Sequence, residues 1–460
     1  DPRAQAELVR LTGGEFEARQ NPTVKDLLDR AAAELTEDKI AVRFPNQPRV
    51  QAEILVTVGN TYLGLGQYAK AVDHLTRARD RLSQSLGPRH PDTLAVRRAV
   101  AHTVSRTRPA DAIALLEELH CDCAAALGPD HPDTLTTLDN LAVAFYRAGR
   151  TADAVALQEK VRDARAAALG PDHPDRLGTL NNLALAYRQE GRLAEATALL
   201  EKVRDAKATA LGPDHPSTLD TQLNLASTYA AAGKFDRSVP LLEEALRLRK
   251  ATQAPDHPLA LLTMTSLGAS YRDAGRLADA ARVLEEALAL ARSRPAAMPP
   301  DLRLTLALTY DRGSQFARAE PLYRELVDVA RRKSGAGRPP VGVALNRLGL
   351  NLVRQGRAAE AEPALRECLA IREKYGPGGW RVFETRAVLG GALLAQKRYA
   401  EAEPLLRAGY EGMRERAARV PADSRARLRD ALDRLIELAD ARRDKDAAAK
   451  WQQERDAMTP

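Results

Sequence analysis

The sequence predicts an all-α protein, a solenoid in which antiparallel helix pairs follow one another along the chain. Three observations support this fold class. The 460 residues exceed the roughly 250–300 that one hydrophobic core usually serves. A short segment around a histidine recurs every 41 or 42 residues, and a glycine recurs between its copies. Such self-similarity indicates an array of repeats, each of which packs only against its neighbours.

The recurring segment first occurs as Gly87-Pro88-Arg89-His90-Pro91, and its later copies carry aspartate in place of the arginine. Its glycine and proline end one helix and start another, so the segment separates successive repeats. We expect the histidines to serve the loop or to cap the next helix. The histidines are His90, His131, His173, His215 and His257. Four residues two positions further on are also predicted caps. They are Asp92, Asp133, Asp175 and Ser217.

A second break divides each repeat into a first and a second helix of about 15 residues. We expect the glycine at this break to take the left-handed conformation that ends the first helix. These turn glycines are Gly66, Gly149, Gly191, Gly233, Gly275 and Gly356. In the first helix a small residue precedes an aromatic residue by three positions, as Ala184 precedes Tyr187, so both lie on one face. The second helix carries its own small residue, such as Ala196, which lets the two helices approach closely.

The predicted order is an N-terminal helical cap, about nine repeats and a C-terminal capping pair. The cap covers residues 1–48, with Val24 to Phe44 as its main helix. The array covers residues 49–421. A closing helix pair covers 422–460, and its charged, apolar-poor sequence suits an end that has no further neighbour.

Two repeats depart from the pattern at their turns. The second, 92–127, has no turn glycine and carries Val104 in place of the aromatic residue. The ninth has Lys397 at the turn-glycine position. We therefore expect the third to sixth repeats, from 133 to about 293, to be the most regular part of the array.

Together, the small residue, the aromatic residue, the turn glycine and the alanine of the second helix resemble the tetratricopeptide repeat. The long period and the segment Leu211-Gly212-Pro213-Asp214-His215-Pro216 are similar to the kinesin-light-chain type. This resemblance implies a right-handed superhelix whose first helices line a concave surface. Four stretches also resemble the repeat region of bacterial, planctomycete-like serine/threonine protein kinases. They are 26–32, 44–48, 64–71 and 445–451.

A row of amide side chains marks the candidate binding site. Three asparagines lie two positions before the small residue of the first helix, namely Asn140, Asn182 and Asn224. An amide both donates and accepts hydrogen bonds, so it can pair with the backbone of a bound peptide. The kinesin-light-chain resemblance implies that these asparagines line the groove, whereas the alternative is that they bond between adjacent first helices. Three nearby arginines would favour acidic ligands. They are Arg147, Arg188 and Arg272.

The sequence thus predicts a scaffold for protein–protein interaction that binds a peptide or partner protein. The kinase resemblance implies the regulatory or interaction region of a signalling kinase, with a kinase domain upstream of Asp1. The alternative is an oligomerisation or spacer module of a multidomain enzyme, which self-associates and has no ligand of its own. No catalytic residue is expected, because His-Arg-Asp, Asp-Phe-Gly and strand-borne glycine-rich motifs are missing from the sequence.

Other partner classes are not expected. The net charge of +7 is spread along helices where arginine alternates with acidic residues, which disfavours nucleic acid. No apolar run approaches the ~18–20 residues of a membrane helix. His120-Cys121-Asp122-Cys123 does not place its side chains on one helix face, so neither a metal nor another cofactor is expected. Acidic pairs such as Glu243-Glu244 are interpreted as solvated faces. Three cysteines suit a reducing compartment, so we expect the cytoplasm, with a membrane anchor upstream left open.

Overall fold

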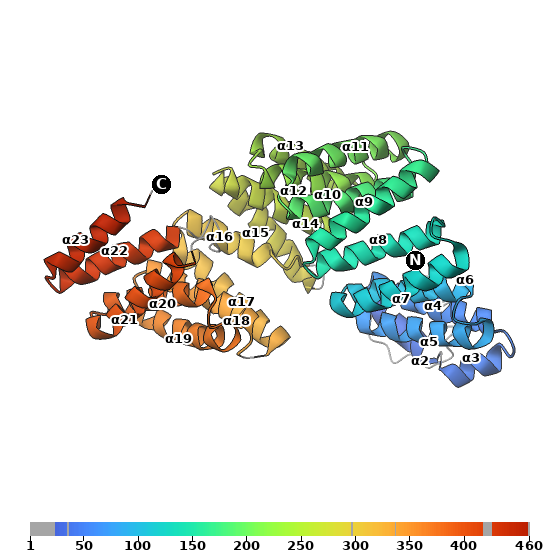
Figure 1. Cartoon of the computed structure of the whole chain (residues 1–460), viewed down its shortest axis with the longest axis horizontal. Helices are drawn as coiled ribbons and strands as arrows, with labels where there is room; N and C mark the ends of the chain where they lie inside the picture. Colours follow the sequence, from blue (N-terminus) through green and yellow to red (C-terminus); the bar gives the residue numbers. More distant parts are fainter. Residues whose placement is uncertain (1–23, 35, 296–297, 336, 417–425, 459–460) are drawn as a thin grey trace. The chain divides into compact units, whose positions relative to one another are not determined.

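The computed structural model describes residues 24–34, 36–295, 298–335, 337–416 and 426–458. Within these ranges the chain forms helices and no strand (Figure 1). The helices belong to two compact units, residues 1–232 and 233–460, called here the N-terminal and C-terminal units. The predicted all-α class is confirmed. None of the helices in the described ranges combines the length and the apolar character needed to cross a membrane.

The N-terminal unit contains two short helices followed by successive helix pairs. Its helices are α2 (Val24–Glu34), α3 (Glu37–Arg43), α4 (Pro48–Gly64), α5 (Tyr68–Leu86), α6 (Pro91–Ser105), α7 (Pro109–Leu127), α8 (Pro132–Arg147), α9 (Thr151–Ala168), α10 (Pro174–Gln189), α11 (Leu193–Leu211) and α12 (Pro216–Ala231). The prediction of one helix from Val24 to Phe44 is wrong. A new helix starts after Thr36, whose hydroxyl accepts the Lys39 N–H. Residues 1–23 of the predicted cap lie outside the described residues.

The C-terminal unit continues the same alternation. Its helices are α13 (Phe235–Thr252), α14 (Pro258–Asp273), α15 (Leu277–Ser293), α16 (Leu302–Arg312), α17 (Phe316–Ser334), α18 (Pro339–Arg354), α19 (Ala358–Tyr375), α20 (Trp380–Ala395), α21 (Tyr399–Arg414), α22 (Ala426–Ala441) and α23 (Lys445–Asp456). The predicted closing pair corresponds to α22 and α23, and its first residues, 422–425, lie outside the described residues.

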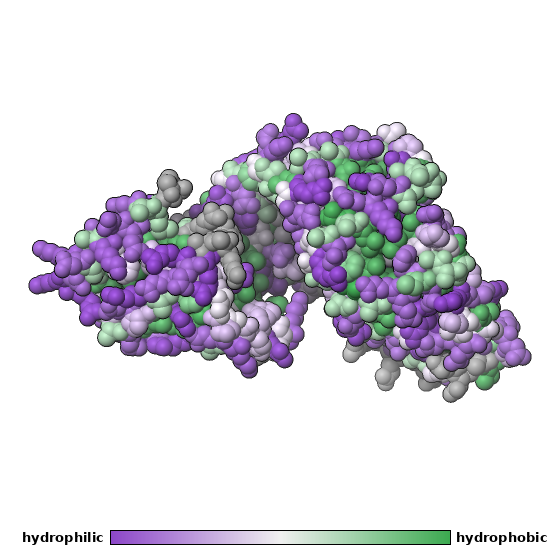
Figure 2. Space-filling view, viewed as in Figure 1, coloured by the Kyte–Doolittle hydropathy of each residue, from purple (hydrophilic) through white to green (hydrophobic). Residues whose placement is uncertain are grey.

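Neighbouring helices pack in chain order within each unit. In the N-terminal unit α7 packs on α8, α8 on α9 and α9 on α10, and the first helices α8, α10 and α12 also touch in sequence. Leu183, Ala184, Ala196 and Leu200 are completely buried between their helices. The small residues therefore lie where the predicted helix pairing requires them. Figure 2 shows that the visible surface is largely hydrophilic, with apolar residues in smaller areas among the hydrophilic ones.

The recurring histidines are the N-caps of the helices that follow them. In α12 the Nδ1 of His215 accepts the backbone N–H of Ser217 at 3.2 Å, and in α10 His173 accepts from Asp175 in the same way. His90, His131 and His257 cap α6, α8 and α14. The predicted capping role of the histidines is confirmed. The prediction that Asp92, Asp133, Asp175 and Ser217 are the caps is wrong, because these residues lie inside the first helical turn and donate to the histidine.

The turn between the two helices of a repeat holds a left-handed residue in every repeat but the second. All six predicted turn glycines have φ between 70° and 82°. Three other turns place a side chain there, with φ of 56° at Ser314, 61° at Lys397 and 58° at Arg443. A left-handed non-glycine residue costs roughly 1–2 kcal/mol, so these three turns are strained. The turn of α22 and α23 thus repeats the geometry of the array.

A tyrosine of one repeat bonds to a glutamate of the repeat before it. The hydroxyl of Tyr187 in α10 donates to Glu159 in α9 at 2.5 Å, and that of Tyr310 in α16 donates to Glu285 in α15 at 2.9 Å. Tyr271 donates to Glu243 in the same arrangement. The predicted solvated face at Glu243-Glu244 is confirmed, since both residues are exposed, but Glu243 also accepts this bond from the next repeat.

The arginine after the turn glycine covers the same tyrosine. The guanidinium of Arg192 lies 3.7 Å from the ring centroid of Tyr187, and that of Arg276 lies 4.3 Å from the ring of Tyr271. A guanidinium at this distance is attracted to the face of the ring. Tyr187 and Tyr271 are thus fixed at the hydroxyl by the preceding repeat and at the ring face by their own turn.

A buried or half-buried basic residue also joins successive repeats. Arg165 in α9 donates to the Thr179 hydroxyl of α10 at 2.6 Å, and Lys207 in α11 donates to Thr221 of α12 at 3.0 Å. Arg372 in α19 donates to Thr385 of α20 at 2.5 Å. Arg165 is buried and the other two donors are half-buried, and all three stay paired because the next helix offers a hydroxyl at an equivalent place.

Exchanging two residues in the turn between α16 and α17 should stabilise the chain. Gly313 has φ of −86°, which any residue adopts, whereas Ser314 beside it has φ of 56°. The double variant Gly313→Ser, Ser314→Gly keeps the composition of the unfolded chain and removes the strain. We expect about 1 kcal/mol of stabilisation, measured as a higher melting temperature. The single variant Gly313→Ser should give no gain, and an unchanged melting temperature of the double variant would contradict the strain argument.

The tyrosine–glutamate bond predicts a stability loss in alkali. Burial first, and then the Glu243 carboxylate, raise the pKa of Tyr271 to about 12, against about 10 in an unfolded chain. The unfolded chain therefore loses the proton first, so this contribution is complete below about pH 10 and is lost as the pH rises toward 12. Tyr271→Phe should cost about 1 kcal/mol at pH 8 and make the alkaline decline shallower. Tyr399→Phe is the control, since Tyr399 is half-buried at the start of α21 and, within the described ranges, takes part in none of the tyrosine–glutamate bonds. An equal effect of the two variants on the alkaline decline would refute the assignment to the Tyr271–Glu243 bond.

Candidate binding groove

The candidate groove follows the first helices of three successive repeats in the N-terminal unit. α8, α10 and α12 touch in order, so equivalent side chains from the three helices lie beside one another. Asn140, Asn182 and Asn224 are all half-buried on these helices. Half-burial leaves part of each amide accessible while the helices hold its position.

Two of the predicted site residues line the same small pocket. Asn182 of α10 and Arg147 of α8 border a cavity of about 130 Å³ between α8, α9 and α10. The remaining lining residues are Ala142, Val143, Tyr146, Ala154, Gln158, Leu185 and Ala186. An amide, a guanidinium and a tyrosine around an apolar floor form a typical small recognition pocket, in which a few polar groups set orientation.

Asn182 is held by a buried acidic network. It hydrogen-bonds the carboxylate of Asp139, which also accepts from Gln158 at 2.8 Å and lies 3.4 Å from Arg165. The Asp139 side chain is only 15% exposed. Burial raises the pKa of Asp139, and the Arg165 charge and the hydrogen bonds oppose that shift only in part. The network fixes the orientation of the Asn182 amide from below.

Arg147 brings a positive charge to the edge of this pocket. Its Nη1 donates to the Ser105 hydroxyl at 2.7 Å, and within the described ranges it takes part in no ion pair. Burial and the neighbouring Arg106 lower the pKa of Arg147. Burial, Arg106 and Arg147 likewise lower the pKa of His102. This end of the groove is therefore basic, and a carboxylate arriving there would relieve the repulsion.

The third asparagine is engaged within the array. Asn224 donates to the Oδ1 of Asn181 at 3.2 Å, across adjacent first helices. This bond is the arrangement expected if the amides serve packing between repeats. For Asn140 the described residues provide no equivalent bond. Of the six predicted residues, Asn182 and Arg147 thus border one pocket.

The other two arginines differ in their surroundings. Arg188 is half-buried in the last turn of α10, and among the described residues it forms no ion pair. Arg272 pairs with its neighbour Asp273 at 2.8 Å and belongs to the C-terminal unit. Its charge is therefore already balanced.

The sequence reasoning missed two polar residues of the site, Asp139 and Gln158. A signal for Gln158 is present, because the equivalent positions of the next two repeats are the buried Leu200 and Leu242. Within the described part of the chain no three His, Cys, Asp or Glu side chains gather as a metal ion would require. Cys121 is exposed and Cys123 is buried.

Comparison with known proteins gives matches to the repeat family along most of the chain. One model of the tetratricopeptide repeat matches residues 50–120, 175–251, 221–293, 301–374 and 341–415, and a second matches 134–175. The first alone covers more than half of the sequence. A search of the curated proteins gives no match.

Several solved structures are also similar to this chain. The TPR-like repeats assigned to a kinesin light chain of Podosopora anserina are 32% identical, with a TM-score of 0.40, and the match covers 45% of this chain and 98% of that one. Apo RapI is 10% identical, with a TM-score of 0.52 over 80% of this chain and 98% of that one. The apo quorum sensor NprR of B. thuringiensis is 16% identical, with a TM-score of 0.50 over 77% and 99%. The last two share the fold. The family-model matches, which extend over more than half of the sequence, show that the chain belongs to the tetratricopeptide repeat family.

Proposed function

We propose that this chain is a protein-interaction scaffold that holds a peptide segment of a partner protein against α8, α10 and α12. The repeat fold supports this proposal, because stacked helix pairs offer extended surfaces suited to such segments. The observation that carries it is the pocket of Asn182 and Arg147. There, an oriented amide lies beside a half-buried guanidinium that has no carboxylate partner within the described ranges.

The two residues would divide the recognition between them. The amide of Asn182 pairs with the peptide backbone, which tolerates many sequences, because it both donates and accepts. The guanidinium of Arg147 takes an acidic side chain or a terminal carboxylate, and a bidentate bond of this kind is among the stronger polar contacts in proteins. Val143 and Leu185 supply apolar contact on the pocket wall. The preferred ligand is thus an extended segment with one acidic group.

A finer proposal places this scaffold in a bacterial signalling kinase of the cytoplasm. It rests on the likeness of residues 26–32, 44–48, 64–71 and 445–451 to the repeat regions of such kinases. The reading frame upstream of Asp1 tests it. A kinase domain encoded there would support the assignment, and its absence would overturn it.

The competing role is self-association without a separate ligand. Light scattering over a concentration series separates the two roles. A dimer whose affinity falls in the Arg147→Gln variant would mean that the pocket binds a second copy of the chain, and a monomer at every concentration would remove this role.

Peptides selected against the intact chain provide the direct test of the groove. A displayed random peptide library should yield binders rich in aspartate and glutamate. For a selected peptide, we expect Asn182→Ala and Arg147→Gln each to weaken binding by about 1.5–3 kcal/mol, measured by fluorescence polarisation. Asn224→Ala should weaken peptide binding less, because the Asn224 amide already donates its hydrogen bond to Asn181.

Lys202→Ala is the matched control, since this residue is exposed on α11. It should leave affinity unchanged. Circular dichroism and melting curves of every variant confirm that the array stays folded. If the folded Asn182→Ala and Arg147→Gln variants bind the peptide as tightly as the unchanged chain does, the proposal of a peptide-binding groove is refuted.

A further inference from the structure

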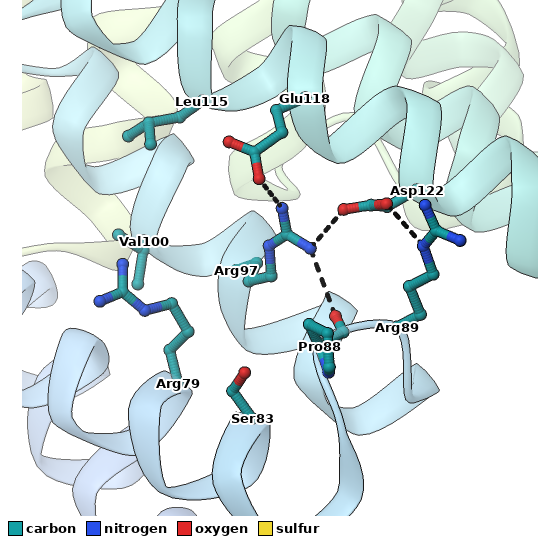
Figure 3. A pocket seen from close by; sticks show the side chains of 9 residues that line it. All are labelled: Arg79, Ser83, Pro88, Arg89, Arg97, Val100, Leu115, Glu118 and Asp122. Atoms are coloured by element: carbon teal, nitrogen blue, oxygen red, sulfur yellow. Dashed lines mark hydrogen bonds and ion pairs between the residues drawn. The ribbon is translucent and has the colours of Figure 1, made fainter.

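A second pocket lies in the second repeat, away from the groove. It encloses about 650 Å³ between α5, the loop before α6, α6 itself and α7 (Figure 3). Its lining residues are Arg79, Ser83, Pro88, Arg89, Arg97, Val100, Leu115, Glu118 and Asp122. None of these residues borders the groove pocket. The two sites are therefore separable by mutation.

In the third and fourth repeats, hydrophobic core residues fill the position that corresponds to this pocket. The third repeat packs Leu135 and Leu138 of α8 against Val161, Leu157 and Ala164 of α9. The fourth repeat packs the equivalent residues in the same way. They are Leu177, Leu180, Val203, Leu199 and Ala206. An apolar core at this place is thus the regular solution of the array.

The second repeat departs from that solution at four positions, which meet in space. Arg97 replaces Leu138 and Leu180, and Asp122 replaces Ala164 and Ala206. Glu118 stands where the next repeats have Lys160 and Lys202. Arg89 stands where they have Asp130 and Asp172. The four positions spread over 34 residues of sequence, from 89 to 122, yet they form one wall of the pocket (Figure 3).

These four side chains form a connected network. Arg97 Nη1 donates to Asp122 at 2.7 Å, and its Nη2 donates to Glu118 at 2.9 Å. Arg89 Nε donates to Asp122 at 2.8 Å. Burial raises the pKa of Asp122, but the two arginines outweigh it and hold that pKa below its ordinary value. Asp122 is thus a fixed carboxylate that anchors both arginines.

Fold stability alone does not account for the network. Arg97 and Asp122 are 14% and 15% exposed, so both ions are largely desolvated. Replacing a buried ion pair by apolar residues of similar volume is often neutral or stabilising, by about 1–4 kcal/mol. The neighbouring repeats show that a leucine and an alanine fit these positions. With Arg97 and Asp122 in place of the leucine and alanine, the second repeat contains a cavity, and Leu115 at its edge is 37% exposed.

The open side of the pocket is arranged for an anion. Arg79 and Ser83 of α5 and Arg97 of α6 all line it (Figure 3). The carboxylate on Arg97 Nη2 belongs to Glu118, whose side chain is 72% exposed and is held at one point. The bond to Glu118 therefore shows that Arg97 Nη2 binds an anionic oxygen from this side. Because the Glu118 side chain is exposed, it can move away into solvent. Val100 and Leu115 provide an apolar wall beside the charges.

We propose that this pocket binds the phosphoryl group of a small phosphate monoester, which displaces Glu118 from Arg97 and places its apolar body against Val100 and Leu115. Three terminal oxygens can accept from Arg79, Arg97 and Ser83 together, whereas a carboxylate has only two. Asp80 lies outside the pocket and keeps its bond to Arg79, at 2.6 Å. With Glu118 displaced, Arg79, Arg89 and Arg97 face the carboxylates of Asp80 and Asp122, which leaves one uncompensated positive charge.

Phenyl phosphate is the probe, titrated calorimetrically into the full chain. We expect saturable binding that is about tenfold or more tighter than that of benzoate. Glu118→Gln should tighten binding, because it removes the charge that competes for Arg97. Arg97→Leu combined with Asp122→Ala rebuilds the apolar pair of the next repeats and should abolish binding while the melting temperature holds or rises.

Arg79→Gln and Arg162→Gln form the matched pair. Arg162 is the equivalent of Arg79 two repeats later and bonds Asp163 as Arg79 bonds Asp80. Only Arg79→Gln should weaken the binding of phenyl phosphate. This variant also tests the site if the double variant Arg97→Leu, Asp122→Ala does not fold. Absence of saturable binding, equal affinity for benzoate, or equal losses from Arg79→Gln and Arg162→Gln would each overturn the proposal. Groove variants should leave this binding unchanged.

Discussion

The hydroxyl of a tyrosine in one repeat donates to a glutamate of the repeat before it, across a contact that buries apolar residues of both. The Tyr187–Glu159 and Tyr310–Glu285 bonds are two instances. Two helices cannot cover their own apolar faces, so each repeat needs its neighbour to complete its core. Only 4% of the residues of the chain are aromatic, and this low content follows from the repeat packing, because one aromatic residue per contact is enough. The groove helices also gain their spacing from these contacts.

The periodic features could be predicted from the sequence, because each occurs several times and is local in the chain. Turn glycines, small residues and loop histidines depend on backbone conformation within a few residues, and their repetition separates them from chance. The helix bounds and left-handed turns follow from these residues. The exact capping residue could not be predicted, because the side chains of His215 and Ser217 can both cap a helix. Only the structure shows that His215 accepts the backbone N–H of Ser217.

The candidate site was less predictable, since it depends on side chains from different repeats. Asn182 and Arg147 are 35 residues apart, and nothing local indicates that they share a pocket. Asn224 has the same sequence position as Asn182 but a different partner, because its neighbour across the helices is Asn181 and not an aspartate. Equivalent positions therefore carry different chemistry according to the adjacent repeat.

Packing only between neighbours has a consequence for how such a chain can change. In a globular domain, placing Arg97 and Asp122 in the core would disturb contacts throughout the molecule. Here the disturbance ends within α5, α6 and α7, and the intact cores of the third and fourth repeats remain beside it. A duplicated repeat can thus exchange part of its core for a polar cavity while its neighbours preserve the fold. Each added repeat supplies a fresh surface on which a different specificity can arise independently.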